Sequence, residues 1–341
     1  MKRLTAFLVG LVFILLFNTL SLPHSGKVRA QTSGAQIVPI YLYPSDFPFK
    51  QKNFDALKEG IAQIQSWYMK ATGGYTFDYA SPVALQSSHD LGWFKYCSTS
   101  GCVNESVDWG RVNQALRELG YSSCVSGKIY LVVMDGAGGF AGGGWCGSKN
   151  SGGLALVGTW TYQSHYGDYK CKDYLECNTG SDWGEAAHEL GHALGLPHTY
   201  DKDPSCSSLM AQHYDFPWVG LCSSSLVDEV SFLKSLNYFG DKRTTGDTAP
   251  PMVTLTSPTK GTTVSGYLPL TVTASDNTKI QRVDYYLDGK QYAMNVISFN
   301  NHIYPTLAKA DGSHTFEVKA YDYAGNVSTS CLATVTFANG S

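Results

Sequence analysis

Charged residues are scarce in this sequence. Asp, Glu, Lys and Arg make up 16% of it, against roughly a quarter of an average soluble chain. The formal net charge is -3 with the two signs interspersed, so no basic stripe offers a surface to the phosphates of a nucleic acid. A mainly electrostatic nucleic-acid binder is therefore excluded, and we expect no nucleic-acid partner.

The CxxC pairs of a zinc knot are also missing. Eight of the nine cysteines fall between positions 97 and 222, and such an even cluster in an exported chain indicates disulfides. Spacing alone leaves the pairing open. Proximity favours three pairs: Cys97 with Cys102, Cys171 with Cys177, and Cys206 with Cys222. We expect Cys331, which stands apart, to be a buried free thiol in a strand.

Only the N-terminus has a long uncharged apolar run. Lys2 and Arg3 precede residues 4–22, and the small residue Ala30 follows at a typical cleavage position. This layout predicts a signal peptide, cleavage after Ala30 and a secreted protein. The alternative is an uncleaved membrane anchor. Polar residues and a proline weaken that alternative: Thr5, Asn18, Thr19 and Pro23. We expect no stable membrane insertion after cleavage.

Hydrophobic periodicity predicts the first folded part. Residues 37–43, 128–134 and 154–157 have the apolar pattern of strands, and apolar residues recur at helical spacing over 54–68 and 107–119. Alternating strands and helices predict an α/β (α+β) domain with a mixed, mostly parallel sheet. A further apolar helix is expected to close the domain through Leu226, Val230, Leu233 and Leu236.

A change of composition marks a second part. Residues 240–251 are rich in charge, glycine and proline, as linkers are. The alternating short segments that follow predict a β-sandwich. The residues 283–289 and 312–326 resemble the immunoglobulin-like modules of secreted bacterial enzymes. We therefore expect four regions: a signal peptide (1–30), a catalytic α/β domain (31–243), a linker (244–250) and an immunoglobulin-like sandwich (251–341).

The segment 135–153 is dense in glycine, tryptophan and cysteine. Gly136, Gly138 and Ala141 follow a strand and mimic a dinucleotide-binding fingerprint, yet three more glycines stand where its helix would begin. Nucleotide binding is therefore disfavoured. We interpret the segment as a disulfide-pinned surface loop beside a sheet edge.

The residues with the clearest chemistry lie between positions 181 and 198. Asp182 and Glu185 form a capping box that predicts a helix start. On this helix His188 and His192 are one turn apart, so both can bind one ion. Glu189 projects beside them. Two histidines are one protein ligand short of a catalytic zinc site.

A third ligand follows at a suitable offset. Gly195 tolerates the left-handed conformation that ends a helix, so the chain can turn and bring His198 to the same ion. The predicted metal ligands are His188, His192 and His198, and the predicted cofactor is Zn2+. The fourth position stays open for water, whose proton Glu189 can accept as the catalytic base.

A second metal is not expected. Asp276, Asn277 and Asp322 carry oxygen atoms of the kind that bind calcium, but capping of turns explains these residues more simply.

The pattern HExxHxxGxxH resembles the metzincin clan of zinc metallopeptidases, over roughly residues 37 to 239. The resemblance implies a secreted zinc-dependent endopeptidase that hydrolyses peptide bonds of a protein or peptide substrate by Glu189-assisted attack of a zinc-bound water. It implies that Met210 packs beneath the histidines as a structural floor. It also implies a substrate-pairing edge strand, for which Leu154 to Val157 is the candidate.

One position departs from the clan pattern. Some families place a tyrosine two residues after the methionine to support the oxyanion, and here Gln212 occupies it. His213 or Tyr214 is left as a substitute.

Two other interpretations stay open. One is a surface-binding protein with a structural zinc, its fourth ligand supplied by Cys206 or His213. The other makes the immunoglobulin-like region the functional element, which binds a cell-surface or wall polymer.

Overall fold

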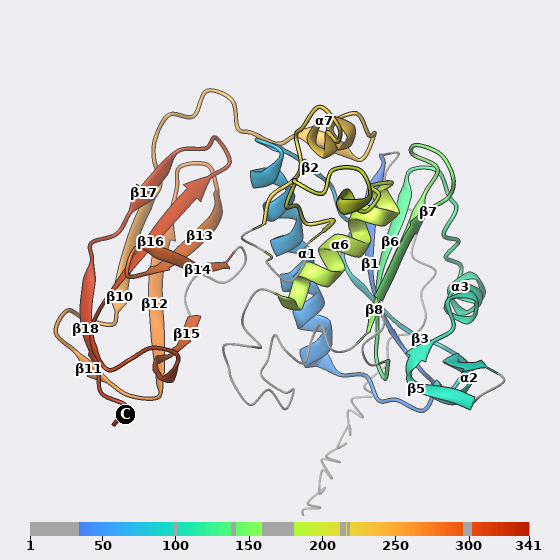
Figure 1. The fold of residues 1–341 in the computed structure, drawn as a ribbon, viewed down its shortest axis with the longest axis horizontal. Helices are drawn as coiled ribbons and strands as arrows, with labels where there is room; N and C mark the ends of the chain where they lie inside the picture. The colour runs from blue at the N-terminus through green and yellow to red at the C-terminus, as the bar shows by residue number, and fades with distance from the viewer. Residues whose placement is uncertain are drawn as a thin grey trace, which may run out of the picture. The chain divides into compact units, whose positions relative to one another are not determined.

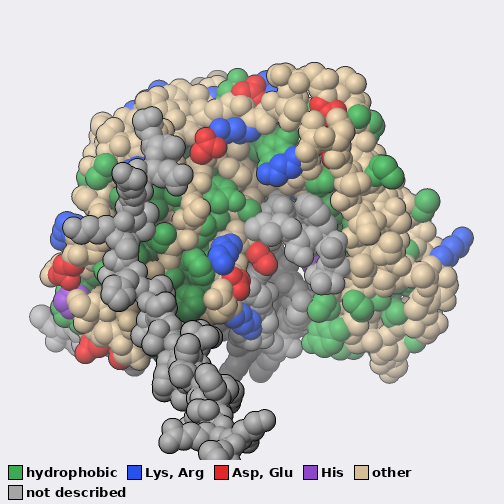
Figure 2. Space-filling model, turned by 180° about the vertical axis from the view of Figure 1, so that it is seen from behind, with side chains coloured by type: hydrophobic (Ala, Val, Ile, Leu, Met, Phe, Trp, Pro, Cys, Tyr) green, Lys and Arg blue, Asp and Glu red, His purple; other side chains and the backbone are tan. Residues whose placement is uncertain are grey.

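The computed structural model describes residues 34–98, 101–137, 141–158, 181–211, 216, 219–295 and 302–340. The predicted signal peptide lies outside the described residues. Within the described part of the chain, no helix is long and apolar enough to cross a membrane. On the face drawn in Figure 2, basic and acidic side chains of the described residues are scattered among neutral ones.

A mixed sheet forms the centre of the N-terminal part, with helices over both faces (Figure 1). Its strand order is β3-β1-β6-β8-β7, and every neighbouring pair is parallel except β8 with β7. The strands are β1 (Gln36–Tyr43), β3 (Val83–Gln86), β6 (Lys128–Met134), β7 (Ala141–Trp145) and β8 (Gly153–Gly158). The predicted fold class is confirmed.

Alternate side chains of each central strand face opposite helical layers. Leu131 and Val133 of β6 belong to the core beneath α1 and α6, whereas Val132 and Met134 pack with α3. A strand buried on both faces is apolar throughout, which explains the continuous run KIYLVVM. The helices are α1 (Gln51–Ala71), α2 (Leu91–Phe94), α3 (Trp109–Glu118), α6 (Ser181–Leu194) and α7 (Glu229–Lys234), with a 3-10 turn η1 (Thr199–Asp201).

Two short antiparallel pairs flank the sheet. β2 (Tyr75–Phe77) pairs with β9 (Phe239–Asp241), so the segment expected as a linker from residue 240 begins as a strand. β4 (Lys95–Ser98) pairs with β5 (Gly101–Val107), where Cys97 and Cys102 are opposite each other in register.

Two expectations about the sheet edge were wrong. The glycine-rich segment expected as a loop contains the strand β7. Glycine has a low strand propensity, but pairing with the neighbouring strand β8 holds the segment extended. The expected edge strand, residues 154–157, lies inside β8, which has β6 on one side and β7 on the other. In the described sheet, the strand at this edge is β7.

Two further expectations need correction. The closing helix α7 begins only at Glu229, and Leu226 is 70% exposed ahead of it. Cys331 is a free thiol as expected, but it is exposed and lies between strands rather than within one.

The C-terminal part is a sandwich of β-sheets around its own core, as predicted (Figure 1). One sheet has the order β10-β12-β15 and the other β11-β18-β16-β13-β14, with β17 paired to β16. The elements are β10 (Met252–Ser257), β11 (Thr263–Val264), β12 (Tyr267–Ser275), β13 (Ile280–Leu287), β14 (Lys290–Asn295), β15 (His302–Pro305), η3 (Thr306–Ala308), β16 (Gly312–Asp322), β17 (Val327–Thr329) and β18 (Ala333–Phe337).

Candidate metal centre

Helix α6 presents two of the predicted ligands side by side. It begins at Ser181, one residue before the expected cap Asp182. The ring centroids of His188 and His192, one turn apart, are separated by 4.6 Å. His188 is 5% exposed, so its ring faces the interior of the protein rather than solvent.

Gly195 ends this helix as the sequence predicts, in the left-handed conformation with φ at 106°. The N–H of Leu196 donates to the carbonyl of Gly191, and the N–H of Gly195 donates to the carbonyl of His192. These two bonds form a Schellman motif. The chain therefore reverses directly after the helix and returns toward the histidines.

The reversal brings the third predicted ligand to the first two. Nε2 of His192 and Nε2 of His198 lie 3.1 Å apart, and one ligand nitrogen from each of the three histidines lies within 4.8 Å of the others. Tetrahedral zinc with nitrogens at about 2.0–2.1 Å separates its ligands by roughly 3.3 Å. The donor set and its spacing therefore fit zinc.

Backbone carbonyls fix the orientation of two rings. Nδ1 of His188 lies 2.9 Å from the carbonyl oxygen of Leu209, and Nδ1 of His192 lies 2.7 Å from that of Leu196. A carbonyl only accepts, so each ring donates through Nδ1 and keeps the lone pair on Nε2. This is the tautomer that a metal ligated through Nε2 requires.

The charge state of His192 also suits a ligand. Burial is the main influence and lowers its pKa; the Leu196 carbonyl opposes this effect, and His198 adds to it. A lowered pKa favours the neutral imidazole, which is the form that binds a metal.

Glu189 is partly buried, next to the first ligand on the same helix. Burial, and to a smaller extent the carboxylate of Glu185 one turn earlier, raises its pKa to about 7. A carboxyl group with a pKa near neutrality can both accept and release a proton.

Met210 has no exposed surface and lies against the helix between the two histidines. A Cβ atom added to Gly191 would stand 2.5 Å from Sδ of Met210, so only glycine leaves room for the thioether. The neighbouring residue Leu209 supplies the carbonyl that orients His188. The methionine segment therefore lies directly against α6.

A close backbone contact sets β7 beside the same helix. A Cβ atom added to Gly143 would overlap the carbonyl group of Glu189 and stand 2.9 Å from Cβ of His192. The glycines of β7 therefore allow the edge strand to pass immediately next to the histidine helix. The run of glycines is the sequence feature that indicates this close approach, although from the sequence alone we interpret it as part of a loop.

Several predicted residues are placed elsewhere or not described. Gln212, His213 and Tyr214 lie outside the described residues. Cys206 is bonded to Cys222, so this predicted pair is confirmed and its sulfur is no thiolate ligand. Cys124 pairs with Cys146, which proximity did not suggest. Cys171 and Cys177 also lie outside the described residues.

Two of the three residues expected to cap turns in the C-terminal part, Asp276 and Asp322, do so, whereas Nδ2 of Asn277 donates to Oδ1 of Asp247. Asp276 accepts hydrogen bonds from the N–H groups of Thr278 and Lys279, and Asp322 accepts one from the N–H of Asn326. Carboxylate oxygens of Asp247, Asp276 and Asp322 lie within 4.8 Å of one another.

Two segments of the chain match known family models. Residues 130–224 match the family model described as metallo-peptidase family M12, a range that includes the three histidines and Met210. The N-terminal part is similar to the M12 metallopeptidases. Residues 251–318 match the model described as bacterial Ig domain. The resemblance to a metallopeptidase joined to an immunoglobulin-like domain is thus confirmed, and a match to a metallopeptidase model implies a metal site.

Matches to solved structures are weaker. The fibronectin(III)-like modules of Clostridium thermocellum CbhA share 28% identity and a TM-score of 0.22, over 26% of this chain and 46% of that one. This chain thus spans less than half of their length. OgpA from Akkermansia muciniphila shares 14% identity and a TM-score of 0.38, over 92% and 97% of the two chains. The M60 catalytic domain of Clostridium perfringens ZmpC shares 10% identity and a TM-score of 0.22, over 87% and 76%. No curated protein matches significantly.

Proposed function

We propose that this protein is a secreted zinc-dependent endopeptidase whose metal is held by His188, His192 and His198. The observation that carries the proposal is the convergence of three imidazoles, two of them oriented by backbone carbonyls. The M12 match over the same residues supports peptide hydrolysis. The disulfides and the bacterial Ig match support an extracellular location.

Glu189 is proposed to move the proton of the reaction. When bound, zinc polarises the peptide carbonyl and lowers the pKa of a water to about 7. A carboxylate oxygen of Glu189 accepts one proton from the attacking water as the new C–O bond forms. The same oxygen then donates that proton to the leaving nitrogen as the C–N bond breaks, so a peptide and a water yield a carboxylic acid and an amine.

The substrate is proposed to lie along β7, not along the strand expected from the sequence. β7 is the edge of the described sheet, and its backbone approaches His192 closely through Gly143. An extended peptide can add to such an edge through main-chain hydrogen bonds. This position would put the scissile bond beside the histidine cluster.

Metal analysis tests the assignment directly. We expect the purified protein to contain equimolar zinc and to cleave peptides from a mixed library. A chelator should abolish cleavage, and added zinc should restore it. His192→Ala should remove both the metal and the activity. A purified protein that binds no zinc, or that cleaves equally well after complete metal removal, would refute the proposal.

We further propose that residues 31–243 form the peptidase domain and that residues 251–341 hold it to a cell-surface or wall polymer. The sandwich's own core cluster and its Ig match support this role as a module. Deletion of residues 248–341 should abolish binding to cell walls and leave cleavage of a soluble peptide intact. Equal wall binding by the truncated chain would contradict this role.

A further inference from the structure

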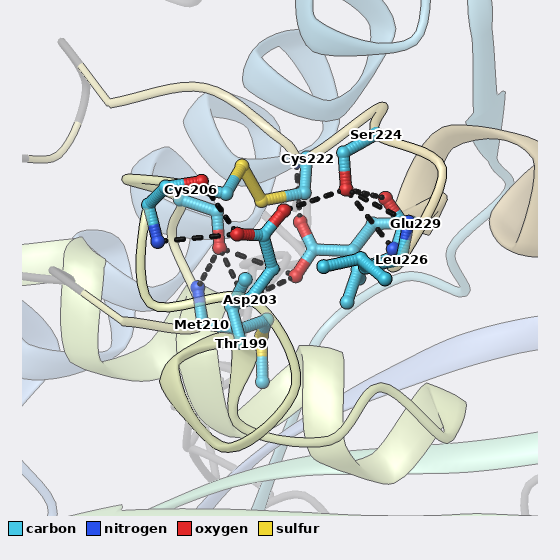
Figure 3. Close-up of a disulfide and its surroundings, with 11 residues drawn as sticks. Thr199, Asp203, Cys206, Met210, Cys222, Ser224, Leu226 and Glu229 are labelled. Carbon is cyan, nitrogen blue, oxygen red and sulfur yellow. Dashed lines mark hydrogen bonds between the residues drawn. A yellow bond between two sulfur atoms is a disulfide. The ribbon is translucent and has the colours of Figure 1, made fainter.

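A buried carboxylate outside the predicted ligand set connects segments of the metal centre. Glu229, the first residue of α7, is 1% exposed. Its Oε1 accepts hydrogen bonds from the hydroxyls of Thr199 at 2.6 Å and Ser208 at 3.2 Å. Its Oε2 accepts one from the N–H of Cys222 at 2.7 Å. Figure 3 shows this carboxylate among the loops around the disulfide.

The first of these partners adjoins a predicted ligand. Thr199 directly follows His198 and is completely buried. Its hydroxyl also lies 2.6 Å from that of Ser208. The segment that carries the third histidine is therefore tied to Glu229 both directly and through Ser208.

The second partner adjoins the methionine segment. The Ser208 hydroxyl accepts a hydrogen bond from the N–H of Met210 at 3.1 Å. Between these two residues is Leu209, whose carbonyl orients His188. One carboxylate thus links the segment of the third histidine to the group that orients the first.

The third partner, Cys222, lies at the end of the loop that the disulfide closes between Cys206 and Cys222. Cys222, whose N–H binds Oε2, is joined to Cys206 by the disulfide. Burial of a carboxylate costs free energy unless hydrogen bonds replace its water. Among the described residues, two hydroxyls and one N–H donate hydrogen bonds to the carboxylate of Glu229. Because burial of the Glu229 carboxylate costs free energy, its presence here requires an explanation beyond core packing.

We propose that Glu229 is a positioning residue of the metal centre, which acts through Thr199 and Ser208 to hold His198 and the Leu209 carbonyl in register with α6. This inference rests on the proposed zinc site, and it identifies Glu229 as a residue that determines the affinity of that site for zinc. Loss of a group that orients metal ligands typically costs 10–100-fold in metal affinity.

A matched pair of serines provides the test. Ser208 and Ser224 lie near the two ends of the same loop, and each hydroxyl hydrogen-bonds to a carboxylate. The partner of Ser224 is Asp203, whose carboxylate also accepts hydrogen bonds from the N–H and the hydroxyl of Ser205. We would measure zinc affinity of the full chain by chelator competition, the absorption spectrum of the Co2+ form, and the melting temperature without metal. The variants are Ser208→Ala, Thr199→Val, Glu229→Gln and the control Ser224→Ala.

The inference predicts about 10–100-fold weaker zinc binding and an altered Co2+ spectrum in the first three variants, with Ser224→Ala like wild type. Should Glu229→Gln fail to fold, the two hydroxyl variants decide. Wild-type zinc affinity and spectrum in both would overturn the inference, as would an equal loss in Ser224→Ala. The absence of zinc from the wild-type protein would instead refute the proposed function.

Discussion

The two parts of the molecule bury polar groups in different ways. Around the histidines, bonds between buried groups join segments distant in sequence, as from Glu229 to Thr199 and from His188 to Leu209. In the sandwich, the buried carboxylates of Asp284 and Asp322 bond to groups a few residues away, on Arg282 and Asn326. A more distant contact of a sandwich carboxylate, that of Asp288 with His314, is exposed. Distant polar contacts cost more to assemble, because the chain must be ordered on both sides. The difference indicates where the structure is organised for chemistry rather than for stability alone.

The largest expected effect is a loss of peptide cleavage when a single side chain, Glu189, is changed. Glu189→Gln preserves the shape of the residue but cannot accept the water proton, so peptide cleavage should fall by roughly 10²–10⁴-fold. Zinc content and melting temperature should stay close to wild type. Activity assays with metal-quantified protein check this. Cleavage at the wild-type rate would remove the proposed base from the mechanism.

The next largest effect is on stability, and cysteine substitutions in the two regions compare it. Cys206 and Cys222 are 16 residues apart, and a disulfide that closes a loop of this length contributes about 3 kcal/mol. Their replacement by serine should lower the free energy of unfolding by about that amount, as measured by denaturant titration. Cys331→Ser is the control, because that thiol is free and exposed. Equal losses in both would mean that the disulfide contributes no stability.

A pair of adjacent glycines tests the packing of β7. Gly143→Ala should cost about 1–3 kcal/mol, since the new methyl group meets the rigid backbone of Glu189. Gly144→Ala is matched in type and strand, but its added Cβ meets no atom within 4 Å. Thermal denaturation of both variants checks the difference. Similar stabilities would show that α6 and β7 are not in close contact.

The smallest expected effect lies in the sandwich. Burial lowers the pKa of His314, but hydrogen bonds to Asp288 and to the Ala310 carbonyl outweigh it and raise the pKa above 6.5. Because the folded state holds the proton of His314 more tightly than the unfolded state, protonation stabilises the fold. This stabilisation is complete below pH 6.5 and is lost as the pH rises through the raised pKa. Its size should not exceed about 1 kcal/mol.

Melting curves at about pH 5.5 and about pH 8 check this contribution. His314→Gln should reduce the difference between the two pH values. An unchanged pH dependence in this variant would assign the effect to another group.

The elements that the sequence predicts well are those determined by local pattern. β6 has the predicted bounds, and α3 falls within the predicted range, because apolar periodicity alone specifies them. The convergence of His188, His192 and His198 was predictable because a helical turn and one glycine determine it.

The features that the sequence did not reveal depend on partners distant in the chain. β7 is a strand because β8 lies beside it, although its own residues favour a turn. Glu229 is ordinary by position at a helix start, and only the folded loops give its carboxylate three donors. Neither long-range pairing nor the Cys124–Cys146 bond leaves a periodic trace in one sequence.

The glycine strand has a practical consequence for anyone who wishes to retune cleavage preference. Along Gly142, Gly143 and Gly144, β7 offers a peptide only main-chain atoms, so it can align a substrate without choosing among side chains. Selectivity must then come from other segments around the histidines, and the disulfide-closed segment between Cys206 and Cys222 is a candidate because its Leu209 carbonyl contacts His188. Libraries should vary that loop and leave the strand untouched.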